Sequence, residues 1–156
     1  MNPNKSAVVA TDVSPRAIKS VYPEPFASRF NGRTKRSLGD FFGIKKFGVN
    51  LTDLEPGAAS ALLHRHSKQE EFIFVLSGNP TLVLENEEVQ LSAGMCAGFI
   101  PSGSAHQIVN RTSEKVIYIE IGDRESSDVV TYPVDDFVAE MKDGTWAFCH
   151  KDGRPY

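Results

Sequence analysis

The chain has 156 residues, of which 40% are hydrophobic and 24% charged, and its net charge is −3 at pH 7. This length corresponds to about one domain, and the composition is that of an ordinary globular protein rather than a disordered or fibrous one. The acidic balance argues against a general DNA-wrapping protein, and no apolar stretch reaches the roughly 18 residues of a membrane helix. Two cysteines, Cys96 and Cys149, are too few for a disulfide scaffold or a thiolate metal site.

Residues 1–43 are rich in turn-forming residues and predict an arm laid over the domain. The segment Tyr22-Pro23-Glu24-Pro25-Phe26 must be extended, because a residue that precedes a proline avoids the helical region. We expect four phenylalanines to anchor the arm, namely Phe26, Phe30, Phe41 and Phe42. The same region lacks the uninterrupted apolar core of a signal peptide, so the expected location is the cytoplasm.

Residues 44–132 predict one short strand after another, with turn residues between the strands. Regular strands with turn signals every 8–12 residues are typical of an all-β sandwich or barrel. The expected strands cover 44–54, 58–66, 71–76, 81–84, 89–91, 96–100, 106–110, 115–121 and 129–132.

Residues 133–156 predict a short C-terminal helix and a tail. Val134, Val138 and Met141 fall at helical spacing after Pro133, and an aspartate in the first turn is available as a cap.

Charge is distributed unevenly along the chain. Residues 29–46 hold six basic residues against one acid, and residues 120–143 hold eight acids against two bases. No aromatic and basic motif for nucleic acid accompanies the basic segment. We therefore interpret both segments as solvated faces that complement each other within the fold or across a dimer.

Three of the four histidines fall where a metal site would need them. His64 and His66 stand two residues apart on a predicted strand, so their side chains share one face. Glu71 begins the next strand and reaches the same centre if its row, with Ile73 and Val75, faces inward. His106 begins another strand after a Pro-Ser-Gly turn.

Two spaced motifs make this sequence resemble the cupin superfamily. The first runs from Gly57 through His64-Arg65-His66 and Glu71 to Gly78, and the second from Gly94 through Pro101-Ser102-Gly103 and His106 to Asn110. A 15-residue connector separates them, as in small bacterial cupins. The resemblance covers residues 44–121 and implies a double-stranded β-helix, or jelly-roll barrel. Gly78 and Asn110 are expected to shape turns rather than to contact a ligand.

The resemblance implies that His64, His66, Glu71 and His106 are the metal ligands. Glu70 is the rival carboxylate, but it points to the opposite face of the strand. The alternative is a cupin that has lost its metal, in which these are polar core or rim residues. A buried cluster of three imidazoles and a carboxylate would be costly without a partner, which favours the metal.

Three neutral imidazoles and one carboxylate suit a divalent ion of Fe, Mn, Ni, Zn or Cu. Four protein ligands leave up to two octahedral positions open, and the net charge of +1 favours an anionic oxygen of a small organic ligand. The walls of the substrate pocket are predicted from strand alternation as Ser60, Leu62, Ile73, Val75 and Ile108.

Two classes of function follow from this site. The first is a metal-dependent enzyme on a small organic acid or ring compound, either a dioxygenase or a metal-assisted isomerase or lyase. The second is a non-catalytic cupin that binds or senses a small molecule, and the fold does not choose between them. The resemblance also implies a homodimer, with the arm folded onto its own barrel or across to a partner. We expect no nucleic-acid or membrane partner.

Overall fold

The computed structural model describes residues 6–17, 20–142 and 144–156, and this part of the chain is almost entirely β-structure. Its strands are β1 (Arg33–Ser37), β2 (Phe47–Leu54), β3 (Arg65–His66), β4 (Glu71–Ser77), β5 (Thr81–Leu84), β6 (Glu88–Gln90), β7 (Cys96–Phe99), β8 (His106–Val109), β9 (Val116–Asp123), β10 (Val129–Thr131), β11 (Val138–Lys142) and β12 (Thr145–Cys149). The helices are short: η1 (Ala10–Asp12), η2 (Ala27–Phe30) and α1 (Leu38–Phe41). None of these described helices has the length and apolar character that crossing a membrane requires. The all-β prediction is confirmed.

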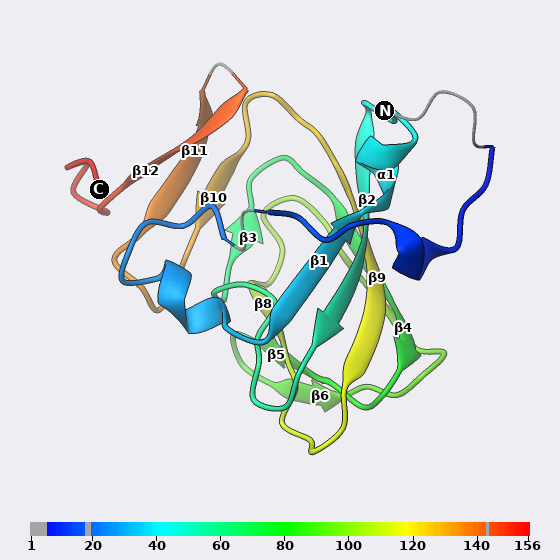
Figure 1. The fold of residues 1–156 in the computed structure, drawn as a ribbon. Helices are drawn as coiled ribbons and strands as arrows, with labels where there is room; N and C mark the ends of the chain where they lie inside the picture. Colours follow the sequence, from blue (N-terminus) through cyan, green and yellow to red (C-terminus); the bar gives the residue numbers. More distant parts are fainter. Residues whose placement is uncertain (1–5, 18–19, 143) are drawn as a thin grey trace.

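The strands form three antiparallel sheets, in the orders β1-β2-β9-β4-β7, β12-β11-β10-β3 and β6-β5-β8. Figure 1 shows β11 and β12 on the side of the molecule opposite β4 and β9, with β5, β6 and β8 below. This arrangement of short antiparallel strands fits a jelly roll.

Strand β4 shows how alternation divides the main sheet into an inner and an outer face. Ile73 and Val75 are buried, with 5% and 0% of their surface exposed, whereas Phe72 and Phe74 are 40% and 38% exposed. Glu71 shares the parity of Ile73 and Val75, so it begins the inner row. The first core lies on this inner face and includes Leu54, Val75, Val116 and Tyr118.

The predicted C-terminal helix is wrong, because its residues form β11. β11 pairs with β10 on one edge and with β12 on the other, so each of its neighbours supplies main-chain hydrogen bonds. The helical spacing of Val134, Val138 and Met141 is overridden by this pairing, since tertiary context outweighs a weak local pattern. Val134 is itself 73% exposed.

The arm packs against these C-terminal strands of its own chain. Phe26 and Phe30 are buried in a second core with Tyr132 and Phe137, and the rings of Phe26 and Phe137 lie 4.6 Å apart. Figure 1 shows the blue arm passing from the α1 side of the molecule to the β10–β12 side and returning into β1. Two of the four expected anchors are therefore buried, but Phe42 is 45% exposed.

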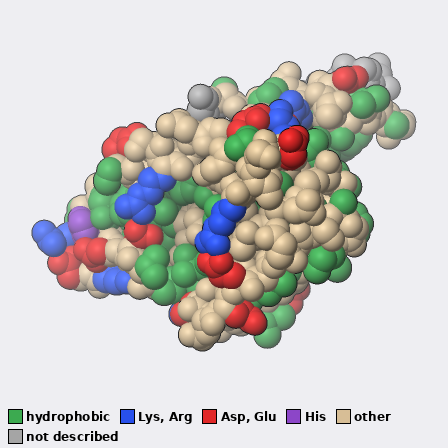
Figure 2. Space-filling model, turned by 90° about the horizontal axis from the view of Figure 1, so that it is seen from below, with side chains coloured by type: hydrophobic (Ala, Val, Ile, Leu, Met, Phe, Trp, Pro, Cys, Tyr) green, Lys and Arg blue, Asp and Glu red, His purple; other side chains and the backbone are tan. Residues whose placement is uncertain are grey.

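The basic and acidic segments of the sequence pair with each other within the chain. Arg29 contacts Asp135 at 3.0 Å, Lys35 contacts Glu120 at 2.5 Å, and the only acid of the basic segment, Asp40, pairs with Arg124 from the acidic one. Figure 2 shows Lys and Arg side chains lying beside Asp and Glu side chains on the face in view. Complementarity within the fold is the interpretation that the structure supports.

Two motif residues have the structural roles expected of them. Gly78 has φ +82°, and a Cβ there would lie 2.8 Å from the carbonyl oxygen of Lys115, so only glycine fits. The buried amide of Asn110 donates to the carbonyl oxygens of Leu54 and Glu114 and thereby joins two turns.

Replacement of Phe137 by alanine is expected to lower the free energy of unfolding by about 3–5 kcal/mol, because a fully buried ring would leave a cavity in the second core. Urea unfolding measures the loss, and Val134→Ala, at an exposed position four residues before β11, is the control. A loss no larger than that of the control would contradict the role of this core in holding the arm.

Candidate metal centre

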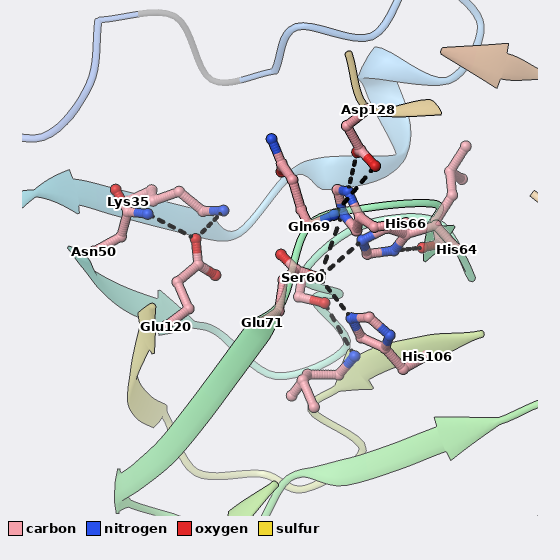
Figure 3. A network of polar contacts seen from close by, with 12 residues as sticks. Lys35, Asn50, Ser60, His64, His66, Gln69, Glu71, His106, Glu120 and Asp128 are labelled. Atoms are coloured by element: carbon pink, nitrogen blue, oxygen red, sulfur yellow. Dashed lines mark hydrogen bonds and ion pairs between the residues drawn. The ribbon is translucent and has the colours of Figure 1, made fainter. Parts of the chain in front are cut away.

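One carboxylate oxygen is the meeting point of the three imidazoles (Figure 3). Glu71 Oε2 lies 2.8 Å from His106 Nε2, 3.4 Å from His66 Nε2 and 3.5 Å from His64 Nε2. The structure therefore brings together all four side chains that the resemblance implied, and Glu71 rather than Glu70 is the carboxylate at the centre.

Three strands and an isolated bridge place these side chains. Glu71 begins β4, His106 begins β8 and His66 ends β3, whereas His64 lies in an isolated bridge to His106. The expected strand over 58–66 is wrong in its extent, because regular pairing is limited to Arg65–His66. The residues before β3 pair with β8 only through isolated bridges. At Ser60 the side-chain hydroxyl, and not a main-chain carbonyl oxygen, accepts the hydrogen bond from the Ile108 N–H.

Nδ1 of His64 and of His66 already has an oxygen partner, so Nε2 of each ring points toward Glu71. His64 Nδ1 lies 2.8 Å from the carbonyl oxygen of Leu62, and His66 Nδ1 lies 2.5 Å from Asp128 Oδ2. When Nδ1–H donates to an oxygen, Nε2 keeps the lone pair that binds a metal. The His106 ring is instead stacked on Phe99, with centroids 3.5 Å apart, and its Nδ1 has no hydrogen-bond partner within the described chain.

The electrostatics of the cluster favour an ionised carboxylate. Burial acts to raise the pKa of Glu71, but hydrogen bonds from His106 and His64 outweigh it and hold this pKa well below 4.5. Burial also lowers the pKa of His106, which favours its neutral form. For His66, burial is outweighed by Asp128 and Glu71, and its pKa is raised.

These residues fit a divalent cation. The ligand atoms of His64, His66 and Glu71 all lie within 4.8 Å of one another, and His106 adds a third imidazole beside Glu71. The Nε2 atoms of all three imidazoles face the Glu71 carboxylate, so the four potential ligand atoms surround one point. A divalent cation among these atoms would replace the hydrogen bonds between imidazole and carboxylate, and nitrogen with carboxylate oxygen is a donor set for Fe, Mn, Ni, Zn or Cu.

Asp128 is a site residue that the sequence analysis did not find. It is fully buried, and its Oδ1 accepts main-chain N–H bonds from Lys68 and Gln69 while Oδ2 holds His66. Burial raises its pKa, but the hydrogen bonds from His66 and Lys68 outweigh burial and the pKa falls below 3.8. Asp128 therefore stabilises the fold above pH 3.8, and this contribution is lost as the pH falls through the lowered pKa.

A cavity of about 230 Å³ opens beside the cluster, many times the roughly 10–15 Å³ that one water needs. Ser60, Ile73 and Ile108 line it, as predicted from strand alternation. Leu62 and Val75 do not line it, and this part of the prediction is corrected: Leu62 packs in the second core and Val75 lies deeper in the first.

The cavity also has a polar wall that the sequence analysis missed. Arg16, Arg33, Lys35 and Glu120 line it together with three tyrosines, Tyr22, Tyr118 and Tyr132. Glu120 points to the same face of its strand as the buried residues Val116 and Tyr118. A charged residue on an otherwise buried face was the sequence signal that could have identified Glu120 as a cavity residue. From the sequence alone, Arg33 and Lys35 are predicted to lie on a solvated face, because the pairing of β1 with β2 is not visible there.

An all-β domain with a histidine and carboxylate cluster in a sheet-lined cavity defines a small jelly-roll-type protein with a candidate metal centre. The Cupin domain family matches residues 50–122, the stretch that holds all four cluster residues. A solved sugar phosphate isomerase of the cupin superfamily from Silicibacter pomeroyi is 36% identical, covers 96% of each chain and superimposes with a TM-score of 0.90. The chain belongs to the cupin superfamily.

Two further solved structures are similar to this chain. A protein described as a candidate sugar phosphate isomerase from Acidithiobacillus ferrooxidans is 31% identical over 88% of this chain and 96% of its own, with a TM-score of 0.74. The polyketide cyclase RemF from Streptomyces resistomycificus is 23% identical over 78% and 80%, with a TM-score of 0.62, which shows a shared fold. A comparison with the curated proteins found no match.

Protein purified without chelator is expected to hold divalent metal, and His64→Ala is expected to lose it, because an Nε2 ligand is removed. Elemental analysis by mass spectrometry measures the content. His150→Ala is the matched control, since His150 lies outside the cavity and binds Asp136. Equal metal content in the wild type and both variants would contradict the site.

Asp128→Asn is expected to weaken metal binding about 10–100-fold, the usual cost of removing a group that orients a ligating histidine. The single amide oxygen of asparagine cannot accept both from His66 and from the main-chain N–H groups of Lys68 and Gln69. Competition with a chelating dye measures the affinity. The control is Asp136→Asn, which disturbs a similar carboxylate–histidine pair at the surface, and an equal effect of both changes would contradict the prediction.

Proposed function

We propose that this protein is a metal-dependent isomerase of a small phosphorylated sugar. The observation that carries the proposal is that one cavity is lined both by the histidine and Glu71 cluster and by three cationic side chains, Arg16, Arg33 and Lys35. A sugar phosphate fits both groups of residues: its carbonyl and hydroxyl oxygens suit a metal at the cluster, and its phosphate suits the cationic side chains.

The cationic wall of the cavity holds three basic side chains and one carboxylate. Lys35 pairs with Glu120 at 2.5 Å, and among the described lining residues Glu120 is the carboxylate outside the metal cluster. Arg33 donates to the Ser60 carbonyl oxygen and lies over the Phe30 ring, and Arg16 donates to Asn50. Three basic side chains on one wall attract a dianion such as a phosphate, and guanidinium groups bind phosphate oxygens in bidentate pairs.

A divalent cation at the cluster would act as a Lewis acid that polarises a carbonyl oxygen and its neighbouring hydroxyl. Isomerisation of an aldose to a ketose needs this polarisation and no external oxidant. The two solved relatives at 36% and 31% identity, named as a sugar phosphate isomerase and a candidate one, support this class. It is one of the reactions expected from the sequence, beside the dioxygenase and the non-catalytic binding protein.

Metal-loaded protein is expected to interconvert an aldose phosphate and the corresponding ketose phosphate in a panel of three- to six-carbon sugars. NMR spectroscopy follows both species, and EDTA is expected to abolish turnover until a divalent metal is restored. The same sugars without phosphate are the control, and they should turn over more slowly because they lack the anion.

Other outcomes of this panel would overturn the proposal. Saturable binding of the sugar phosphates without turnover by any divalent metal would favour the binding protein. Oxygen consumption by the Fe(II)-loaded protein with a catechol or keto acid, and no isomerisation, would favour the dioxygenase.

A further inference from the structure

Glu120 stands on the inner face of the main sheet, beside the metal cluster but outside it. In the pairing of β9 with β4, Glu120 lies opposite Ile73 and Gly122 lies opposite Glu71. Glu120 is therefore the diagonal neighbour of Glu71 on the same face, a relation that places the two residues about 7–8 Å apart and their Cβ atoms somewhat closer. A molecule held by the metal cluster would need to extend only a few atoms to reach the Glu120 carboxylate.

Side chains from two neighbouring strands and from β9 itself hold this carboxylate. Glu120 Oε1 accepts hydrogen bonds from Lys35 Nζ at 2.5 Å and from Asn50 Nδ2 at 3.1 Å. Within the described residues, Oε2 accepts a longer hydrogen bond, 3.3 Å from the Tyr118 hydroxyl. Figure 3 shows Lys35, Asn50 and Glu120 as a group on one side and Glu71 with the histidines on the other. Oε1 is anchored, and Oε2 is the oxygen left to meet a substrate.

The other acidic groups and the histidines in and around the cavity already have partners or keep their protons. The three histidines and Glu71 point at one another, and Asp128 holds His66. Burial raises the pKa values of Tyr22, Tyr118 and Tyr132, so these phenols keep their protons near neutral pH. Among the described residues that line the cavity, Glu120 is the carboxylate available to take a proton.

We propose that Glu120 is the catalytic residue that carries the proton between two neighbouring carbons of the sugar phosphate. This inference rests on the proposed function. Glu120 Oε2 removes the proton from the carbon next to the carbonyl. The electron pair of the broken C–H bond forms a double bond between the two carbons, and the π pair of the carbonyl moves onto its oxygen. The hydroxyl proton then passes from the second oxygen to the first. Glu120 returns its proton to the former carbonyl carbon, so that an aldose becomes a ketose with no net change in electrons or protons.

The test is solvent exchange during turnover by the metal-loaded protein in D₂O. The wild type is expected to place deuterium on the carbon that receives the proton, because a carboxylate can exchange its proton with solvent between the two transfers. Glu120→Gln keeps an oxygen for Lys35 and Asn50 but cannot take a proton. It is expected to lower kcat about 10²–10⁴-fold and to lose deuterium incorporation, while metal content and sugar phosphate binding, measured by calorimetry, stay at the wild-type level.

Two further variants separate chemistry from folding. Glu120→Asp retains a carboxylate one methylene further back and is expected to recover part of the exchange that Glu120→Gln loses, with thermal melting confirming that both variants fold. Glu88→Gln is the matched control, because Glu88 is also a salt-bridged strand glutamate but is exposed and pairs with Arg111.

The outcomes distinguish this inference from the proposed function. Isomerisation by the wild type without deuterium incorporation, or an equal rate in Glu120→Gln, would overturn the role of Glu120 and leave the isomerase standing. Absence of both isomerisation and exchange in the wild type across the sugar phosphate panel would overturn both.

Discussion

The convergence of three imidazole nitrogens on one carboxylate oxygen, Glu71 Oε2, is the interaction on which the site depends. Taking a carboxylate out of water is expensive unless it is paired, and here the nitrogens lie only 2.8–3.5 Å away. Each ring is held from behind by a different part of the fold: a carbonyl oxygen, a buried aspartate and a stacked phenylalanine. The cluster therefore connects β3, β4 and β8 to Asp128, the residue that precedes β10. A displacement of any of these elements would change the geometry of the candidate metal centre.

The cavity beside this cluster lies between the two hydrophobic cores. Ile73, Ile108 and Tyr118 of the first core line it, and so do Val130, Tyr132 and Ala139 of the second. The arm closes the second core and also contributes Arg16 and Tyr22 to the lining. The same packing that stabilises the chain thus brings cationic side chains from outside the cupin motifs to the cavity beside the candidate metal centre.

Predictions from the sequence succeeded where a local rule was sufficient. Alternation along β4 placed Glu71 with Ile73 and Val75 and excluded Glu70, because successive side chains of an extended strand must point to opposite faces. The same rule failed for Leu62, which precedes β3 in an irregular segment and turns into the second core. The helical spacing of Val138 and Met141 was equally misleading, since β11 is stabilised by hydrogen bonds from β10 and β12 that no local pattern records.

The sequence by itself determined the superfamily, the all-β class and the four residues of the cluster, because these depend on motif spacing and on the period of an extended chain. Only the tertiary structure decided which residues face the cluster across the cavity. Lys35, Asn50 and Glu120 belong to β1, β2 and β9, and they meet because those strands are neighbours in one sheet. Strand order is set by long-range pairing and by burial of both cores together, and neither is encoded in the residues next to Glu120.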